Sequence, residues 1–175
     1  VFNDSSPISI NKTTTIRAVC LKAGYLSSKV DTHTYLFPSD VRTQYSNGGA
    51  PAGWPSSSVN GQVFNYGMDP DITSRYSAQE MEDVLTAIPS VMLTTDLENL
   101  TDSSTGIYVN ARERGINWER PAHLEMLQEN AVAPVSIGCG IRIRGGASRN
   151  SNNAKHSFRI FLRDEYGDSK LEYPL

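Results

Sequence analysis

The sequence contains few cysteines, no long apolar run and no excess of positive charge. Its two cysteines, Cys20 and Cys139, stand at apolar positions of predicted strands, where we expect buried free thiols. No apolar run approaches the roughly 20 residues that a membrane span needs. The net charge is −3, whereas a nucleic-acid partner would require a clear excess of Lys and Arg. We therefore expect neither a membrane nor a nucleic acid as the partner of this region.

The chain also lacks the short motifs that carry well-known chemistry. It contains no phosphate-binding GxxxxGK[ST], HExxH, CxxC, GxSxG or EF-hand loop. Gly138-Cys139-Gly140 begins like a dinucleotide fingerprint, but Ile143 stands where the third glycine belongs. The histidines His33, His123 and His156 have no partner at metal-ligand spacing. We therefore predict no catalytic residue and no metal site in this chain.

Turn-forming residues are abundant, with 13 Gly and 9 Pro among 175 residues. This composition is typical of a mainly β to α+β protein. The first segment predicts strands at 7–10, 13–22 and 27–37, with a turn at Gly24-Tyr25. Three strands cannot close a β-sandwich, which usually has about seven. We therefore expect residues 1–37 to be the C-terminal part of an immunoglobulin-like sandwich that begins upstream.

Residues 38–76 differ in character and are expected to link two units. Pro51, Pro55 and the Asn47-Gly48-Gly49 turn interrupt any periodicity. The segment still contains apolar anchors that low-complexity linkers lack, so we expect an extended strap lying on the second domain. These anchors are Tyr45, Trp54, Phe64, Tyr66 and Met68.

A helix is predicted at the start of the second domain, residues 77–175. Ser77 and Glu80 have the spacing of a capping box, and apolar residues then recur at helical intervals until Pro89. The segments that follow are predicted to be strands at about 90–95, 106–109 and 122–127.

The clearest pattern lies at 135–163, where we predict a hairpin with a long loop. Between Val135 and Arg144, apolar residues alternate without error with polar residues or glycine. A second strand at 155–163 has the same alternation, and a Gly- and Asn-rich stretch joins the two. One face of this hairpin is therefore expected to be buried.

All charges in the hairpin are positive. Strand pairing would place several of these residues on one face, where like charges repel, so we expect an anion to compensate them. The six residues are Arg142, Arg144, Arg149, Lys155, Arg159 and Arg163.

Two identities for this anion remain open. The first is a nucleotide phosphate, held by arginine forks, by Lys155 as a point charge and by backbone N–H groups of the Gly145-Gly146 loop. The second is an internal ion-pair network with carboxylates at Glu119, Glu125, Asp164 or Glu165, or downstream of Leu175. The candidate nucleotide-binding residues are Arg142, Arg144, Gly145, Arg149, Lys155 and Arg159.

Two stretches resemble known families. The run SPISINKTTTIRAVCLKAGYLSSKVDTHTYLF is similar to the C-terminal half of the chitobiase/β-hexosaminidase C-terminal domain, an immunoglobulin-like accessory module. Residues from about 65 to 175 resemble the N-terminal part of the CotH kinase family. The matching pieces are Thr105-Gly106-Ile107-Tyr108, Trp118-Glu119-Arg120-Pro121 with Glu125, Gly140-Ile141-Arg142-Ile143-Arg144-Gly145, 155–159 and 171–175.

The CotH family is named for a bacterial spore-coat protein, and the resemblance implies an atypical protein-kinase-like fold. It implies that the full-length parent uses ATP and Mg to phosphorylate a protein substrate, with its metal-binding and catalytic Asp residues downstream. This chain would then be an inactive fragment that supplies the β-rich nucleotide lobe, with Lys155 and Arg144 as preferred phosphate contacts. The parent is expected to be a secreted or cell-surface bacterial protein. The alternative is a non-catalytic surface, adhesion or carbohydrate-associated binding protein.

Overall fold

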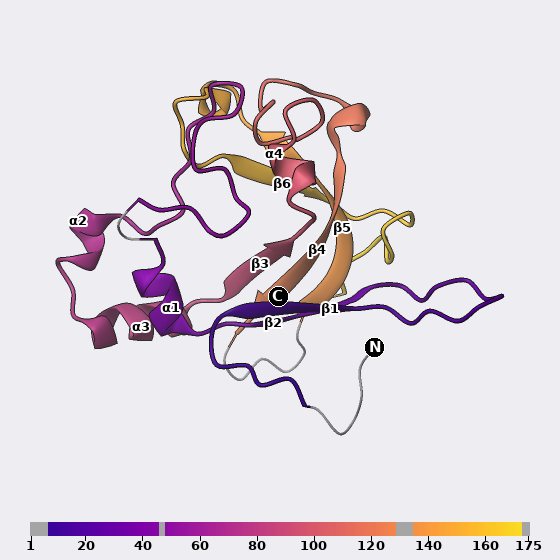
Figure 1. The fold of residues 1–175 in the computed structure, drawn as a ribbon, viewed down its shortest axis with the longest axis horizontal. Helices are drawn as coiled ribbons and strands as arrows, with labels where there is room; N and C mark the ends of the chain where they lie inside the picture. Colours follow the sequence, from indigo (N-terminus) through magenta and orange to yellow (C-terminus); the bar gives the residue numbers. More distant parts are fainter. Residues whose placement is uncertain (1–6, 46–47, 129–134, 173–175) are drawn as a thin grey trace.

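The computed structural model describes residues 7–45, 48–128 and 135–172. The chain is a mainly β protein with short helices and two antiparallel sheets, of which the larger is curled like half a barrel (Figure 1). The smaller sheet pairs β1 (Thr14–Ala18) with β2 (Asp31–Tyr35). The larger has the order β3 (Ser90–Thr94), β4 (Arg120–Leu127), β5 (Val135–Arg144) and β6 (Ser157–Phe161).

One face of the larger sheet forms the hydrophobic core. Alternate residues of β5 point to this face, from Val135 to Ile143, and Ile141 is 1% exposed. Neighbouring strands add Leu124 of β4, and the turn-rich segment before β4 adds Ile107. Burial of such a side chain contributes about 1.5–3 kcal/mol, so this face fixes the register of β5.

The opposite face of β5 is polar and lies beneath the chain that follows β6. A Cβ atom on Gly138 would collide with the carbonyl oxygen of Tyr166. A Cβ atom on Gly140 would lie 2.6 Å from Oε1 of Glu119 and 2.6 Å from a ring carbon of Tyr166. These two glycines therefore let the segment around Tyr166 cross the sheet in direct contact with its backbone.

Residues 19–30 connect β1 to β2 and extend away from the larger sheet as a finger (Figure 1). Two backbone hydrogen bonds close it, from Ser28 N to Cys20 O at 3.1 Å and from Tyr25 N to Lys22 O at 3.1 Å. Leu26 at its tip is 98% exposed. The base of the β1–β2 ribbon is attached to the larger sheet, because Thr34 donates to the buried Glu125 carboxylate through its N–H and its hydroxyl.

The helices are short and lie mostly beside the sheet. The capping box predicted at Ser77 is present, with reciprocal hydrogen bonds to Glu80, and its helix ends before Pro89. Arg42 and Glu82 link two helices through an ion pair of 3.3 Å. The helices are α1 (Pro38–Thr43), α2 (Pro70–Thr73), α3 (Ala78–Ala87) and α4 (Glu98–Thr101), with 3-10 turns η1 (Ile116–Trp118) and η2 (Ala147–Arg149). No helix in the described ranges has the length and apolar character needed to cross a membrane.

The predicted hairpin is confirmed, since β5 pairs with β6 in antiparallel register, whereas several other predictions are wrong. Residues 7–10 form no strand, and Cys20 is exposed because the finger has no partner sheet over it. The segment 106–109 is a turn whose N–H groups bond back to carbonyls near α4. α1, α2 and α4 were not expected.

Candidate functional site

The arginines of the hairpin gather on the polar face of β5 and β6. Arg142 lies directly opposite Arg159, and Arg144 lies opposite Ser157. Arg144 and Arg159 are therefore diagonal neighbours, for which Cα separations of about 7–8 Å are usual. Arg163 joins them from the chain just after β6. We call Arg142, Arg144, Arg159 and Arg163 the arginine face.

The ring of Phe161 lies at the centre of the arginine face. The guanidinium carbon of Arg142 is 4.3 Å from the ring centroid, and those of Arg163 and Arg159 are 5.1 and 5.2 Å away. Phe161 pairs with Gly140, which leaves room for the ring. Each contact of this kind stabilises an exposed cation by about 0.5–1 kcal/mol, so Phe161 orders the arginines without neutralising them.

Glu119 provides the carboxylate for half of this face. Its side chain is 1% exposed and accepts from Arg142 at 2.6 Å and from Arg163 at 2.8 Å. The hydroxyl of Tyr166 donates to the same carboxylate at 3.1 Å. The internal ion-pair network predicted from the sequence is thus present at Glu119, and a longer contact of 4.0 Å joins Arg163 to Glu165. Glu125 takes no part, because it binds Thr34 instead.

These contacts keep Glu119 ionised. Burial alone would raise the pKa of its carboxyl group. Hydrogen bonds from the two guanidinium groups and from the Tyr166 hydroxyl outweigh burial and hold this pKa below its ordinary value. Burial and the adjacent Glu119 carboxylate in turn raise the pKa of Tyr166, which therefore keeps the proton that it donates.

Arg144 and Arg159 have no carboxylate partner among the described residues. Both are exposed. The arginine face therefore carries more positive charge than its own carboxylates compensate. An anion with several oxygens could accept from these two guanidinium groups at once.

The other predicted nucleotide-binding residues have structural partners. Arg149 donates to the backbone oxygens of Gly145, Ala111 and Glu113 at 2.7, 2.7 and 2.9 Å, and also to that of Ile143. Lys155 donates to the backbone oxygen of Gly67 at 3.0 Å. Gly145 has a φ of 115° at the turn after β5, a conformation that favours glycine. These three residues thus shape the loop and attach it to the rest of the molecule.

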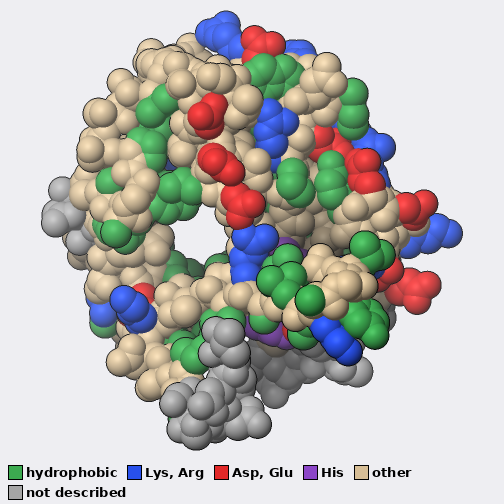
Figure 2. All heavy atoms as spheres, turned by 45° about the vertical axis from the view of Figure 1, so that its right-hand side comes forward, with side chains coloured by type: hydrophobic (Ala, Val, Ile, Leu, Met, Phe, Trp, Pro, Cys, Tyr) green, Lys and Arg blue, Asp and Glu red, His purple; other side chains and the backbone are tan. Residues whose placement is uncertain are grey.

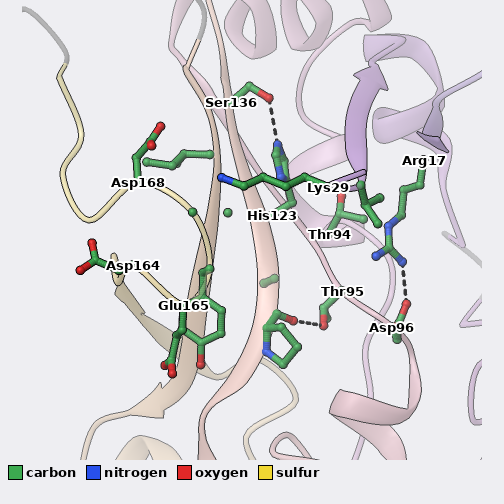
Figure 3. Close-up of a pocket in the computed structure, with 17 residues that line it drawn as sticks. Arg17, Lys29, Thr94, Thr95, Asp96, His123, Ser136, Asp164, Glu165 and Asp168 are labelled. Carbon is green, nitrogen blue, oxygen red and sulfur yellow. Dashed lines mark hydrogen bonds and ion pairs between the residues drawn. The ribbon is translucent and has the colours of Figure 1, made fainter. Parts of the chain in front are cut away.

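A separate cleft of about 430 Å³ lies on the same sheet face, between the β1–β2 ribbon and residues 164–168. Figure 3 shows His123 and Ser136 joined by a hydrogen bond of 2.9 Å, with the Lys29 side chain passing in front of them. Burial lowers the pKa of His123. Arg17 and Asp96 at the rim form an ion pair of 2.6 Å. The lining also contains Lys29, Asp164, Glu165 and Asp168, so this cleft has an excess of carboxylates, unlike the arginine face.

The described residues contain no cluster that suits a metal ion, and the thiol of Cys139 is buried. No group of three or more His, Cys, Asp or Glu in these ranges could hold a metal ion. Burial raises the pKa of Cys139 to about 11, which leaves its thiol protonated near neutral pH. Trp118 packs against the core. His156 is buried, and its ring contacts the backbone oxygen of Ser148 and the side chain of Gln62.

In Figure 2, side chains of both charge signs are spread over one side of the molecule, around an opening near the centre of the view. Comparison of the chain with protein-family models, with curated proteins and with solved structures finds no match.

Proposed function

We propose that this chain forms part of the ATP-phosphate-binding lobe of a secreted or cell-surface bacterial CotH-like protein kinase and is inactive alone. The observation that carries the proposal is the surplus of positive charge on the arginine face. Three guanidinium groups, those of Arg142, Arg159 and Arg163, lie over Phe161, and Arg144 is a diagonal neighbour of Arg159. One buried carboxylate, Glu119, binds Arg142 and Arg163. The resemblance of residues 65–175 to the CotH family supplies the chemical identity of the anion.

Arg144 and Arg159 would hold the phosphates, because both are exposed and neither contacts a carboxylate among the described residues. Arg142 and Arg163 would help to position the phosphates, since Glu119 and Phe161 hold these two side chains in place. Rigid guanidinium groups at a fixed spacing bind a polyphosphate with little loss of side-chain entropy. The finer assignment of the fold, a partial immunoglobulin-like module before a kinase-like lobe, belongs to the same proposal.

The proposal gives this chain a share in binding and no chemical step. Mg and the catalytic Asp residues of such an enzyme would come from elsewhere in the parent, because the described residues contain no cluster that suits a metal. ATP, when bound with Mg, supplies the phosphoryl group that is transferred to a protein hydroxyl. The protein substrate would meet that phosphate beyond the arginine face.

Isothermal titration of the 175-residue chain with ATP and with inorganic tripolyphosphate tests the proposal. Charged hydrogen bonds contribute about 1.5–3 kcal/mol each, so Arg144→Ala and Arg159→Ala should each weaken binding about 10- to 100-fold. Arg75→Ala is the matched control, because Arg75 is also an exposed arginine but lies between α2 and α3.

Two outcomes would contradict the proposal. Equal affinities for wild type and the Arg144→Ala, Arg159→Ala double variant would remove the arginine face from phosphate binding. Binding of tripolyphosphate without any discrimination in favour of ATP would leave a general anion site and would favour the non-catalytic binding protein as the identity of the parent.

A further inference from the structure

A second concave site lies along the chain segment that connects β2 to β3. Residues 54–68 are part of the segment 38–76 that was predicted to form a strap, and from here on we call 54–68 the strap. They run beside the loop that joins β5 to β6 (Figure 1). Val63 N donates to Ser151 O at 3.0 Å, and the Gln62 amide donates to Asn153 O at 2.7 Å. Gln62 is 1% exposed, and its Oε1 lies 2.7 Å from the buried His156 ring. The strap is therefore held in one conformation by buried polar contacts.

Aromatic rings form the wall of this site. Phe64 stacks on Tyr66 with an interplanar angle of 8°, and Trp54 and Tyr45 meet Tyr66 edge to face. On its other side Phe64 stacks on Tyr108, which belongs to the periphery of the core. The stack thus runs from the core to the surface. At its outer end Trp54 and Tyr45 are 38% and 37% exposed.

A cleft of about 390 Å³ opens against these rings. Its lining combines Tyr45, Phe64 and Tyr66 with the hydroxyls of Ser56–Ser58 and the Asn65 amide. None of the described residues that line it is charged, whereas the cleft beside His123 and the arginine face are both rich in charge. An uncharged lining favours an uncharged ligand, because an ion entering it would lose hydration without gaining a counter-charge.

We propose that the strap cleft binds a neutral sugar, as one or two rings of an oligosaccharide. A sugar ring has an apolar face, which suits an exposed aromatic side chain, and a rim of hydroxyls, which suits serine hydroxyls and an amide. A peptide would instead present a row of backbone N–H and C=O groups, and the cleft is bordered by turns and coil with no strand edge to pair with them. The proposal is independent of phosphate binding at the arginine face.

The strap is preorganised for this role. The Tyr66 hydroxyl donates to Pro55 O at 2.8 Å, and Asn65 Oδ1 accepts from Gly67 N at 3.1 Å. The ammonium group of Lys155 donates to the backbone oxygen of Gly67 at 3.0 Å. Because these bonds exist without a ligand, binding would order few additional side chains and would cost little conformational entropy.

Isothermal titration with maltohexaose, cellohexaose and chitohexaose, compared with a galacturonate hexamer, tests the proposal. At least one neutral oligosaccharide should bind, and the acidic one should bind at least about tenfold more weakly. Tyr45→Ala should weaken the neutral interaction about tenfold through loss of the exposed ring. Tyr25→Ala on the finger is the control, because it removes an even more exposed tyrosine, 70% exposed, away from the cleft.

A second variant protects the test against misfolding of Tyr45→Ala. Asn65→Asp keeps the oxygen that accepts from Gly67 but loses the amide donor and adds a charge, so it should fold and still bind the neutral sugar about fivefold more weakly. Absence of binding by any neutral oligosaccharide at about 5 mM would overturn the proposal. Equal loss in Tyr25→Ala, or binding of a proline-rich decapeptide in place of the sugars, would overturn it as well.

Discussion

The two pairs of arginines on the arginine face have the same chemistry and different surroundings. Arg142 and Arg163 bind the Glu119 carboxylate, which is 1% exposed, at 2.6 and 2.8 Å. Arg144 and Arg159 lie within the same few residues of the sequence, yet no carboxylate contacts them among the described residues. The first pair is part of the folded structure, and the second pair is available to a ligand.

The difference shows that a run of positive charge can serve stability and binding at adjacent positions. A buried carboxylate needs its cations, because removing them would leave an uncompensated charge in a poorly hydrated place. An exposed arginine needs no partner, because water solvates it. The location of one glutamate therefore separates the two arginines that bind a carboxylate from the two that contact none among the described residues. Each prediction below tests that separation.

The largest effect is expected from removing the shared carboxylate. Glu119→Ala leaves Arg142 and Arg163 without the carboxylate that they share and deprives Tyr166 of its acceptor. Breaking a buried pair costs about 3–5 kcal/mol, and partial exposure of both arginines places the expected loss near the lower end. Urea denaturation measures it, with Glu113→Ala, an exposed glutamate, as the control. A loss as small as that of the control would show that Glu119 does not separate the two pairs.

A somewhat smaller effect is expected from Gly140→Ala. The added methyl group would lie 2.6 Å from both the Glu119 carboxylate and the Tyr166 ring, so these groups would have to move. Overpacking of this kind destabilises by about 1–3 kcal/mol. Gly146→Ala is the matched control, because a Cβ atom there meets no atom within 4 Å. Equal unfolding free energies for the two variants would contradict the close packing over β5.

The pH dependence of stability should identify the paired carboxylate. Because the pKa of Glu119 is lowered in the folded state, its contribution is present above the unfolded pKa of about 4.3 and is lost as pH falls through the lower folded value. Glu119→Gln should therefore be less stable than wild type at pH 6, and the gap should narrow below about pH 4. Urea denaturation midpoints of wild type and Glu119→Gln, measured at pH 6 and below about pH 4, give this difference in stability. A gap that is constant with pH would mean that ionisation of Glu119 does not stabilise the fold.

The smallest effect on stability is expected from the second pair. Arg144→Ala should leave the free energy of unfolding within about 0.5 kcal/mol of wild type, since it removes an exposed cation. Arg159→Ala should lower it by about 0.5–1 kcal/mol, because it also removes a contact with the Phe161 ring. Relief of repulsion between the two could even raise stability slightly. Urea denaturation of the single and double variants checks this. A loss as large as that for Glu119→Ala would show that the second pair is structural too.

The sequence predicted the framework of this site well. Strict alternation at 135–144 predicted β5 and its buried face, and the capping box at Ser77 predicted α3, because both patterns depend on local periodicity. Glu119 was among the candidate partners of the arginines. Gly138 and Gly140, two residues apart on one strand face, were a signal of close backbone approach that was not used.

The remainder depended on contacts that local patterns do not contain. Arg149 and Lys155 are predicted phosphate contacts, and the structure adds a contact for each that the sequence pattern does not contain. Arg149 donates to the backbone oxygen of Glu113, 36 residues away, and Lys155 donates to that of Gly67, 88 residues away. The apolar residues at 106–109 predicted a strand, but backbone bonds to residues near α4 make them a buried turn. Tyr166 gained its role only from the path of the chain after β6. Tertiary structure decides such positions.

The most direct test of the central claim follows each arginine separately. Nε–Hε resonances of the arginine side chains can be assigned by substitution and observed during titration of the chain with ATP. The Arg144 and Arg159 resonances should shift with saturation, those of Arg142 and Arg163 should shift less because Glu119 holds them, and that of Arg75 should not move. Shifts of similar size at Arg75 and at the arginine face, or none at Arg144 and Arg159, would contradict the account.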